Sequence, residues 1–231
     1  MDTRFYTMTS TTAAFEECLY SQHTPRSARH ATWAPGTDFS QITCPLEHEN
    51  HMRPGPRCTP LYVNLPYLHL PDILWTSYGE ILVPERTIDL FQKHGLTGFA
   101  LKPVTVVSVK GYRGSSFPRA WELVVIGNAG PEILKPGRSY GPPCPGCGLR
   151  EKHNEINGIH VNPATWDGSD ISCTTDYPRI RILSEKAKDV IMGHKLEYCV
   201  IYPAEQYPTF GGGYLERLRA KIYARDRNLS R

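Results

Sequence analysis

The sequence is short of long apolar runs and of cysteine, and each shortage excludes a class of protein. Among the 231 residues, no apolar run approaches the roughly 20 residues of a membrane-spanning helix. Residues 1–18 are polar and threonine-rich and lack the apolar core of a secretory signal, so we expect a cytoplasmic protein without a membrane partner. The seven cysteines are an odd number and too sparse for a disulfide scaffold, which favours reduced thiols and metal binding.

Sequence signatures of catalysis and nucleotide binding are also missing. The chain contains no P-loop, no Gly-x-Ser-x-Gly, no His-Glu-x-x-His and no dinucleotide fingerprint, so we expect a protein that is not an enzyme. A hydrophobic content of 40% and a charged content of 21% are ordinary for a soluble globular protein. Twenty prolines and nineteen glycines predict many turns and few long helices.

Positive charge is concentrated in residues 214–231. This segment holds six Lys or Arg and two acidic residues, a net charge of +4, so the rest of the chain carries −1 of the total of +3. Leu215, Leu218 and Ile222 form a narrow apolar stripe, which predicts a short helix with a basic outer face. Such a face is more often solvated than bound to nucleic acid, and we do not expect a nucleic-acid partner.

A Cys-x-x-Cys-Gly knuckle at residues 144–148 is the strongest chemical signal. Cys144 and Cys147 are separated by two small residues, and two thiolates at this spacing can bind one ion. A structural zinc site needs two further ligands. Cys44 stands 100 residues before Cys144, and both cysteines are followed by proline. We therefore predict Cys44, Cys144 and Cys147 as thiolate ligands of one zinc ion.

Three residues close after Cys44 are candidates for the fourth ligand. They are His48, His51 and Cys58, because zinc accepts imidazole as readily as thiolate. We choose His51. A catalytic zinc would need an open coordination position and a base, and Glu47 is the one nearby residue that suggests it. We expect a structural site.

The interval of 100 residues recurs downstream of the cysteines. A strand, a helix over 84–94 and a second strand are predicted in the first half, and the same succession with a helix over 184–194 in the second. Identical residues stand 100 positions apart in these segments: Glu85 and Glu185, Asp89 and Asp189, His94 and His194, Leu96 and Leu196, Pro103 and Pro203. We expect His94 and His194 to lie at the helix C-termini.

These correspondences predict an α+β fold made by tandem duplication. Each copy would contain a cysteine knuckle followed by a strand–helix–strand unit, and a zinc-ribbon-like metal site would join the copies. We expect a first unit over 1–110, a second over 111–210, and a basic C-terminal helix over 211–231.

Strands outside the repeated segments follow from composition. Residues 1–60 are polar and punctuated by proline, and we expect them to be irregular. Residues 61–65 and 72–75 have the composition of short strands. Residues 104–109 and 121–126 predict a strand pair joined by a basic loop.

Four stretches together resemble the double-CXXCG motif family. They are Pro-Cys-Pro-Gly-Cys-Gly at 143–148, a degenerate partner at Cys44, Leu-Phe-Gln-Lys-His-Gly-Leu-Thr-Gly-Phe at 90–99, and Trp-Asp-Gly-Ser-Asp at 166–170. These bacterial proteins include the myxobacterial Sit-type immunity proteins, which protect a cell from a sibling's toxin. The sequence departs from the family pattern at residues 47–48, where Glu-His stands in place of the second Cys and Gly.

The resemblance implies a function that the residues alone do not. It implies a zinc-containing immunity protein that binds and neutralises a cognate protein toxin, with Cys44, Cys144 and Cys147 matching the family's cysteines. Two alternatives come from the residues: a zinc-containing nucleic-acid-binding protein that uses the segment 214–231, and a metal-dependent hydrolase that uses Glu47 and a histidine.

Truncation tests the role of the basic segment. A chain that ends at Gly211 should keep its melting temperature and its metal, because the triglycine 211–213 is expected to uncouple the segment from the core. Thermal unfolding and elemental analysis measure both. Unfolding of the truncated chain would place the helix in the core. Tight binding of duplex DNA that weakens steeply with salt and disappears on truncation would identify a nucleic-acid arm.

Overall fold

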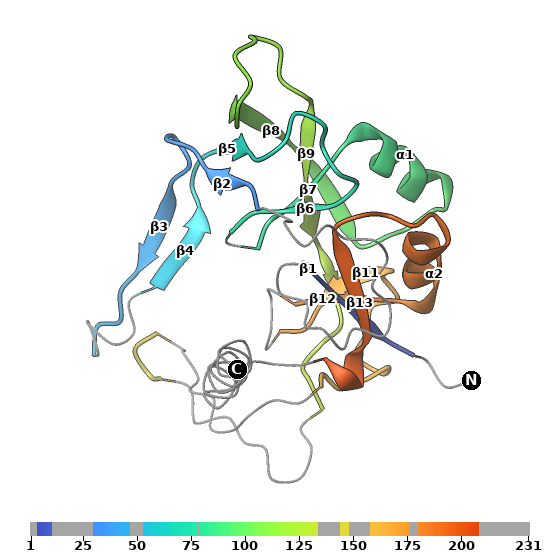
Figure 1. The fold of residues 1–231 in the computed structure, drawn as a ribbon. Helices are drawn as coiled ribbons and strands as arrows, with labels where there is room; N and C mark the ends of the chain where they lie inside the picture. The colour runs from blue at the N-terminus through green and yellow to red at the C-terminus, as the bar shows by residue number, and fades with distance from the viewer. Residues whose placement is uncertain are drawn as a thin grey trace, which may run out of the picture.

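The computed structural model describes residues 4–10, 30–46, 53–77, 79–133, 144–147, 158–175 and 180–207. These residues form an α+β fold of three sheets, two α-helices and one short 3-10 helix (Figure 1). None of the described helices is long and apolar enough to cross a membrane.

The largest sheet has six strands in the order β2-β5-β8-β9-β7-β6. Their bounds are β2 (Thr32–Trp33), β5 (Leu61–Leu65), β8 (Phe99–Val109), β9 (Ala120–Val125), β7 (Ile81–Val83) and β6 (Leu74–Trp75). The β5–β8 pair is parallel and the other pairs are antiparallel. The sheet is therefore mixed.

A second sheet has five strands in the order β10-β11-β12-β1-β13. Their bounds are β10 (Gly127–Asn128), β11 (Ile171–Cys173), β12 (Arg181–Leu183), β1 (Tyr6–Ser10) and β13 (Cys199–Pro203). A separate hairpin pairs β3 (Phe39–Ile42) with β4 (Arg53–Arg57). The 3-10 helix η2 (Ala204–Gln206) follows β13.

The two α-helices form where the sequence predicts them. Helix α1 (Glu85–Lys93) begins after Pro84, whose missing N–H costs nothing at a helix start. Helix α2 (Glu185–Gly193) begins after Ser184, whose side chain accepts a hydrogen bond from the Ala187 N–H at 3.1 Å. Both predictions are confirmed.

Each helix connects two parallel strands that enclose a third, antiparallel strand. In the six-stranded sheet, β7 and β8 flank β9; in the five-stranded sheet, β12 and β13 flank β1. The registers also correspond at an interval of 100 residues. Trp121 of β9 faces Val83 and Pro103, and Tyr6 of β1 faces Leu183 and Pro203. The central strand in each case comes from outside the strand–helix–strand segment.

Reciprocal hydrogen bonds join the segment 72–104, which contains α1, to the segment 170–203, which contains α2. The Asp170 carboxylate accepts from the Thr97 N–H at 3.0 Å, and the Asp72 carboxylate accepts from the Glu197 N–H at 3.2 Å. Each carboxylate also binds a cation of the helix in its own segment, Lys186 with Asp170 and Arg86 with Asp72. The donors Thr97 and Glu197 are 100 residues apart. Each segment thus contacts the other through equivalent groups.

The main core lies where the helices meet the strands. One cluster of buried side chains takes residues from both helices, including Ile88 and Phe91 of α1 and Val190 and Ile191 of α2. Figure 1 shows the helices one above the other on the same side of the molecule, with the β3–β4 hairpin on the opposite side. The two segments therefore share one core.

The expectation that residues 1–60 are irregular is wrong for the part that the structure describes. Strand β1 lies in the middle of the five-stranded sheet, and β2, β3 and β4 also fall in this range. Strand β4 contains Pro54 and Pro56 and pairs with β3 alone among the described strands, which places it at a sheet edge, where proline is tolerated.

The strand pairing predicted downstream of α1 is also wrong in detail. Strand β8 is continuous over Phe99–Val109 and changes partner along its length. Residues 99–104 pair with β9, whereas residues 104–109 pair in parallel with β5. The predicted partner of 104–109 was the segment 121–126. The switch depends on β5, about 40 residues upstream, and the local pattern carries no sign of it.

The turn after each helix has the same backbone but different residues. Gly95 and Gly98 have φ of +58° and +88°, and Lys195 and Tyr198 have φ of +53° and +66°. Both helices end with the same backbone hydrogen bonds. The N–H groups of residues 95 and 96 donate to the carbonyls of 92 and 91, and those of 195 and 196 donate to the carbonyls of 192 and 191. A side chain raises the energy of this left-handed conformation, so the second turn is strained where the first is not.

Substitutions at Lys195 and Gly95 should change the free energy of unfolding in opposite directions. We expect Lys195→Gly to stabilise the protein by about 1 kcal/mol, because it removes the steric cost of a left-handed lysine. Gly95→Ala should destabilise it by about the same amount. The nearest atom to the added Cβ is Lys186 Nζ at 3.9 Å, so the expected loss of stability comes from the backbone conformation and not from a steric clash. Urea unfolding measures both, and a loss of stability in Lys195→Gly would contradict the analysis.

Candidate metal centre

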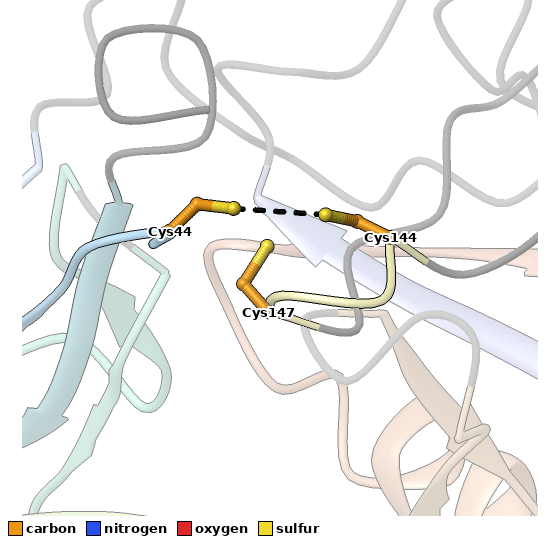
Figure 2. Close-up of side chains that lie close together, drawn as sticks. All are labelled: Cys44, Cys144 and Cys147. Atoms are coloured by element: carbon orange, nitrogen blue, oxygen red, sulfur yellow. Dashed lines mark hydrogen bonds between the residues drawn. The ribbon is translucent and has the colours of Figure 1, made fainter. Parts of the chain in front are cut away.

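Three cysteine thiols converge in the structure. The sulfurs of Cys44, Cys144 and Cys147 all lie within 4.8 Å of one another, and Cys44 Sγ is 3.6 Å from Cys144 Sγ. Figure 2 shows the Cys147 sulfur pointing toward the space between the other two. Cys44 is fully buried and the other two are partly buried. The group has the proximity that a metal site requires.

Two separate pieces of chain supply the thiols. Cys44 follows β3 by two residues, and Cys144 and Cys147 lie in a turn at 144–147. Gly146 brings these pieces together. A Cβ added there would lie 3.1 Å from Cys44 Sγ and 3.1 Å from Leu46 Cγ, closer than ordinary contact allows. The small residue lets the turn lie directly against the chain around Cys44.

The sulfur separation fits a common metal ion. Thiolates bound to zinc at about 2.3 Å in tetrahedral geometry lie about 3.8 Å from each other. The observed 3.6 Å is close to this value and far from the roughly 2.05 Å of a disulfide. A set of three thiolates belongs to the soft donors that zinc, Cu⁺ and iron–sulfur clusters take. The group can therefore hold a metal ion of this class.

The structure brings together the three thiolate ligands predicted from the sequence. Their proximity is sufficient for binding one ion. His51, the predicted fourth ligand, lies outside the described residues, as do His48 and Glu47. Cys58 is described, is exposed, and does not belong to the group.

Two further cysteines lie in environments that disfavour thiolates. Burial, together with the nearby Asp72 carboxylate, raises the pKa of the Cys199 thiol to about 12. Burial also raises the pKa of Cys173, against the opposing effect of Arg181. Metal binding requires the thiolate form. Cys173 and Cys199 thus differ from the converging group, because their environments favour the protonated thiol.

The acidic residues of the 166–170 turn serve the fold. Burial favours a raised pKa for Asp167, but hydrogen bonds from Ser169 and the Asn128 N–H outweigh it and lower the pKa. Asp170 is buried and accepts hydrogen bonds from Thr97 and Ser184. Both side chains accept hydrogen bonds from backbone N–H groups, which is a common role of aspartate in turns.

One pair of side chains was not foreseen as a pair. His94 and His194 were placed at the helix C-termini, where they do lie, but their rings also contact each other, with the Nε2 atoms 3.1 Å apart. The available signal was the interval of 100 residues, which these histidines share with Cys44 and Cys144.

No protein-family model and no curated protein matches the chain.

Substitution of one thiol tests the metal centre. Cys144→Ser should lose the metal and lower the melting temperature by about 10 °C, if the ion contributes roughly 3 kcal/mol to folding at this chain length. Cys173→Ser is the matched control, because Cys173 is partly buried and lies outside the converging group. Elemental analysis of reduced protein measures the metal. Equal metal content in the two variants, or none in the wild type, would contradict the assignment.

Proposed function

We propose that the protein is a non-enzymatic, zinc-containing binding protein. The observation that carries this proposal is the convergence of Cys44, Cys144 and Cys147. Zinc is the ion of choice because sites with three or four cysteines are the usual structural zinc sites, and His51 would complete a Cys₃His set. A fourth protein ligand closes the site, so that the ion holds chain segments together and has no position for a substrate.

We also propose that the fold arose by tandem duplication. The matching strand registers, the matching helix ends and the reciprocal carboxylate contacts support this origin. Cys44 and Cys144 stand at the same interval. In this proposal, the zinc ion joins the first copy's knuckle, which retains one cysteine, to the complete knuckle of the second copy.

The proposed role is neutralisation of a cognate protein toxin. It rests on the resemblance to the double-CXXCG family, through the stretches at 90–99, 143–148 and 166–170. A scaffold with a shared core and a structural metal ion would hold a binding surface in one conformation, which lowers the entropy lost on binding. Asp170 has no part in that surface, because it is buried and saturated with internal hydrogen bonds.

Co-expression tests the proposed role. Products of the genes next to this one would be expressed singly in a sensitive bacterium, with and without the protein. We expect one of them to arrest growth, the protein to restore growth, and the purified pair to form a stable complex. Cys144→Ser should lose the protection, and Cys173→Ser should keep it.

Other outcomes separate the alternatives. Failure of every neighbouring product to arrest growth or bind would overturn the immunity role. Salt-sensitive binding of duplex DNA would favour a nucleic-acid-binding protein. Metal-dependent hydrolysis that is lost in Glu47→Gln would favour a hydrolase.

A further inference from the structure

The contact between His94 and His194 is built by the fold. Each histidine is the C-cap residue of its helix, and its backbone N–H is held by the last turn, to Leu90 O and to Val190 O, both at 3.1 Å. The Nε2 atoms face each other at 3.1 Å, with the ring planes inclined by 66°. His94 is half-buried and His194 is exposed. Solvent therefore reaches the pair.

The separation of the two nitrogens fits a shared metal ion. Imidazole nitrogens bind zinc at about 2.0–2.1 Å, and two of them at an angle of about 100° lie about 3.1 Å apart. The observed distance is the same. An ion can therefore bind both Nε2 atoms with little movement of either ring. Borderline divalent ions such as Zn²⁺, Ni²⁺ and Cu²⁺ are the ones that favour imidazole.

The helices favour a cation at the same point. Both α1 and α2 end at the histidine pair, so the negative end of each helix dipole lies next to it. The nearby Lys186 ammonium is already engaged, with the Gly95 carbonyl at 2.7 Å and the Asp170 carboxylate at 3.3 Å. Its charge is thereby partly compensated.

We infer that His94 and His194 form a second divalent-metal site, distinct from the cysteine centre. Among the described residues, the cysteine trio is the one group of three or more metal-ligating side chains, so the site has two protein ligands and leaves positions open to water or to a ligand from outside. It is therefore weaker and exchangeable. An ion there ties the end of α1 to the end of α2. The inference does not depend on the identity of the metal at the cysteines or on the immunity role.

Metal titration tests this site. Zn²⁺ would be added to untagged, reduced protein whose cysteine centre is already loaded, and binding would be followed by calorimetry and by the melting temperature. We expect one further equivalent to bind and the melting temperature to rise with zinc concentration. His94→Ala and His194→Ala should each weaken this binding by at least about tenfold, as loss of a ligand requires.

Two controls make the result specific. His69→Ala removes an exposed histidine elsewhere and should leave the titration unchanged. Cys144→Ser should lose the cysteine-bound metal and keep the second equivalent, provided that it folds. His94→Gln, which retains a polar side chain of similar size, serves if the alanine variant is unstable, and it should also lose the binding.

Paramagnetic ions locate the site directly. Ni²⁺ or Cu²⁺ added in small amounts to isotope-labelled protein should broaden the amide signals at the ends of α1 and α2, and His194→Ala should abolish the broadening. If no further equivalent binds, or if His94→Ala and His194→Ala bind as the wild type does, the pair is an imidazole–imidazole hydrogen bond and the inference is overturned.

Discussion

Identical residues that stand 100 positions apart in the sequence meet each other at two points, and this constraint organises the structure. If the proposed duplication placed two similar units across a two-fold axis, a residue would touch its own equivalent only at that axis. Cys44 contacts Cys144 at 3.6 Å, and His94 contacts His194 at 3.1 Å, both at an interval of 100 residues. The reciprocal bonds of Asp72 and Asp170 have the relation expected on either side of such an axis. Both candidate metal positions thus lie where identical side chains converge.

The contact between identical side chains limits the interactions that these positions can make. Two thiols or two imidazoles brought together have no opposite charge to attract them, and if both carry a charge they repel each other. A hydrogen bond can form between them, or a cation can bind both. A buried carboxylate is different, because it must receive donors from its surroundings. Asp170 does so through the Thr97 and Ser184 groups and the Lys186 ammonium.

Local signals in the sequence were sufficient for the helices and the thiol group. Pro84 and Ser184 mark the helix starts, and the buried residues of each helix recur with helical spacing. The three cysteines were predicted from the knuckle and from an interval. In each case the decisive information lies within a few residues or in a constant interval between identical residues.

Non-local pairing was beyond the sequence pattern. Strand β1 is short and rich in threonine, and its place between β12 and β13 depends on partners at the other end of the chain. The change of partner along β8 depends on β5 in the same way. The histidine contact required the relative position of two helices. Composition and periodicity describe one element at a time and cannot supply such relations.

The position of β1 has a consequence for the order of folding. Tyr6 pairs with Leu183 and with Pro203, so the five-stranded sheet cannot close before nearly the whole described chain has been synthesised. Contacts between residues so distant in sequence are formed slowly, because a long loop must be closed first. The six-stranded sheet takes its strands from residues 32–125 and can assemble earlier during translation. Residues 6–10, the earliest of the described strands along the chain, are thus among the last to be paired.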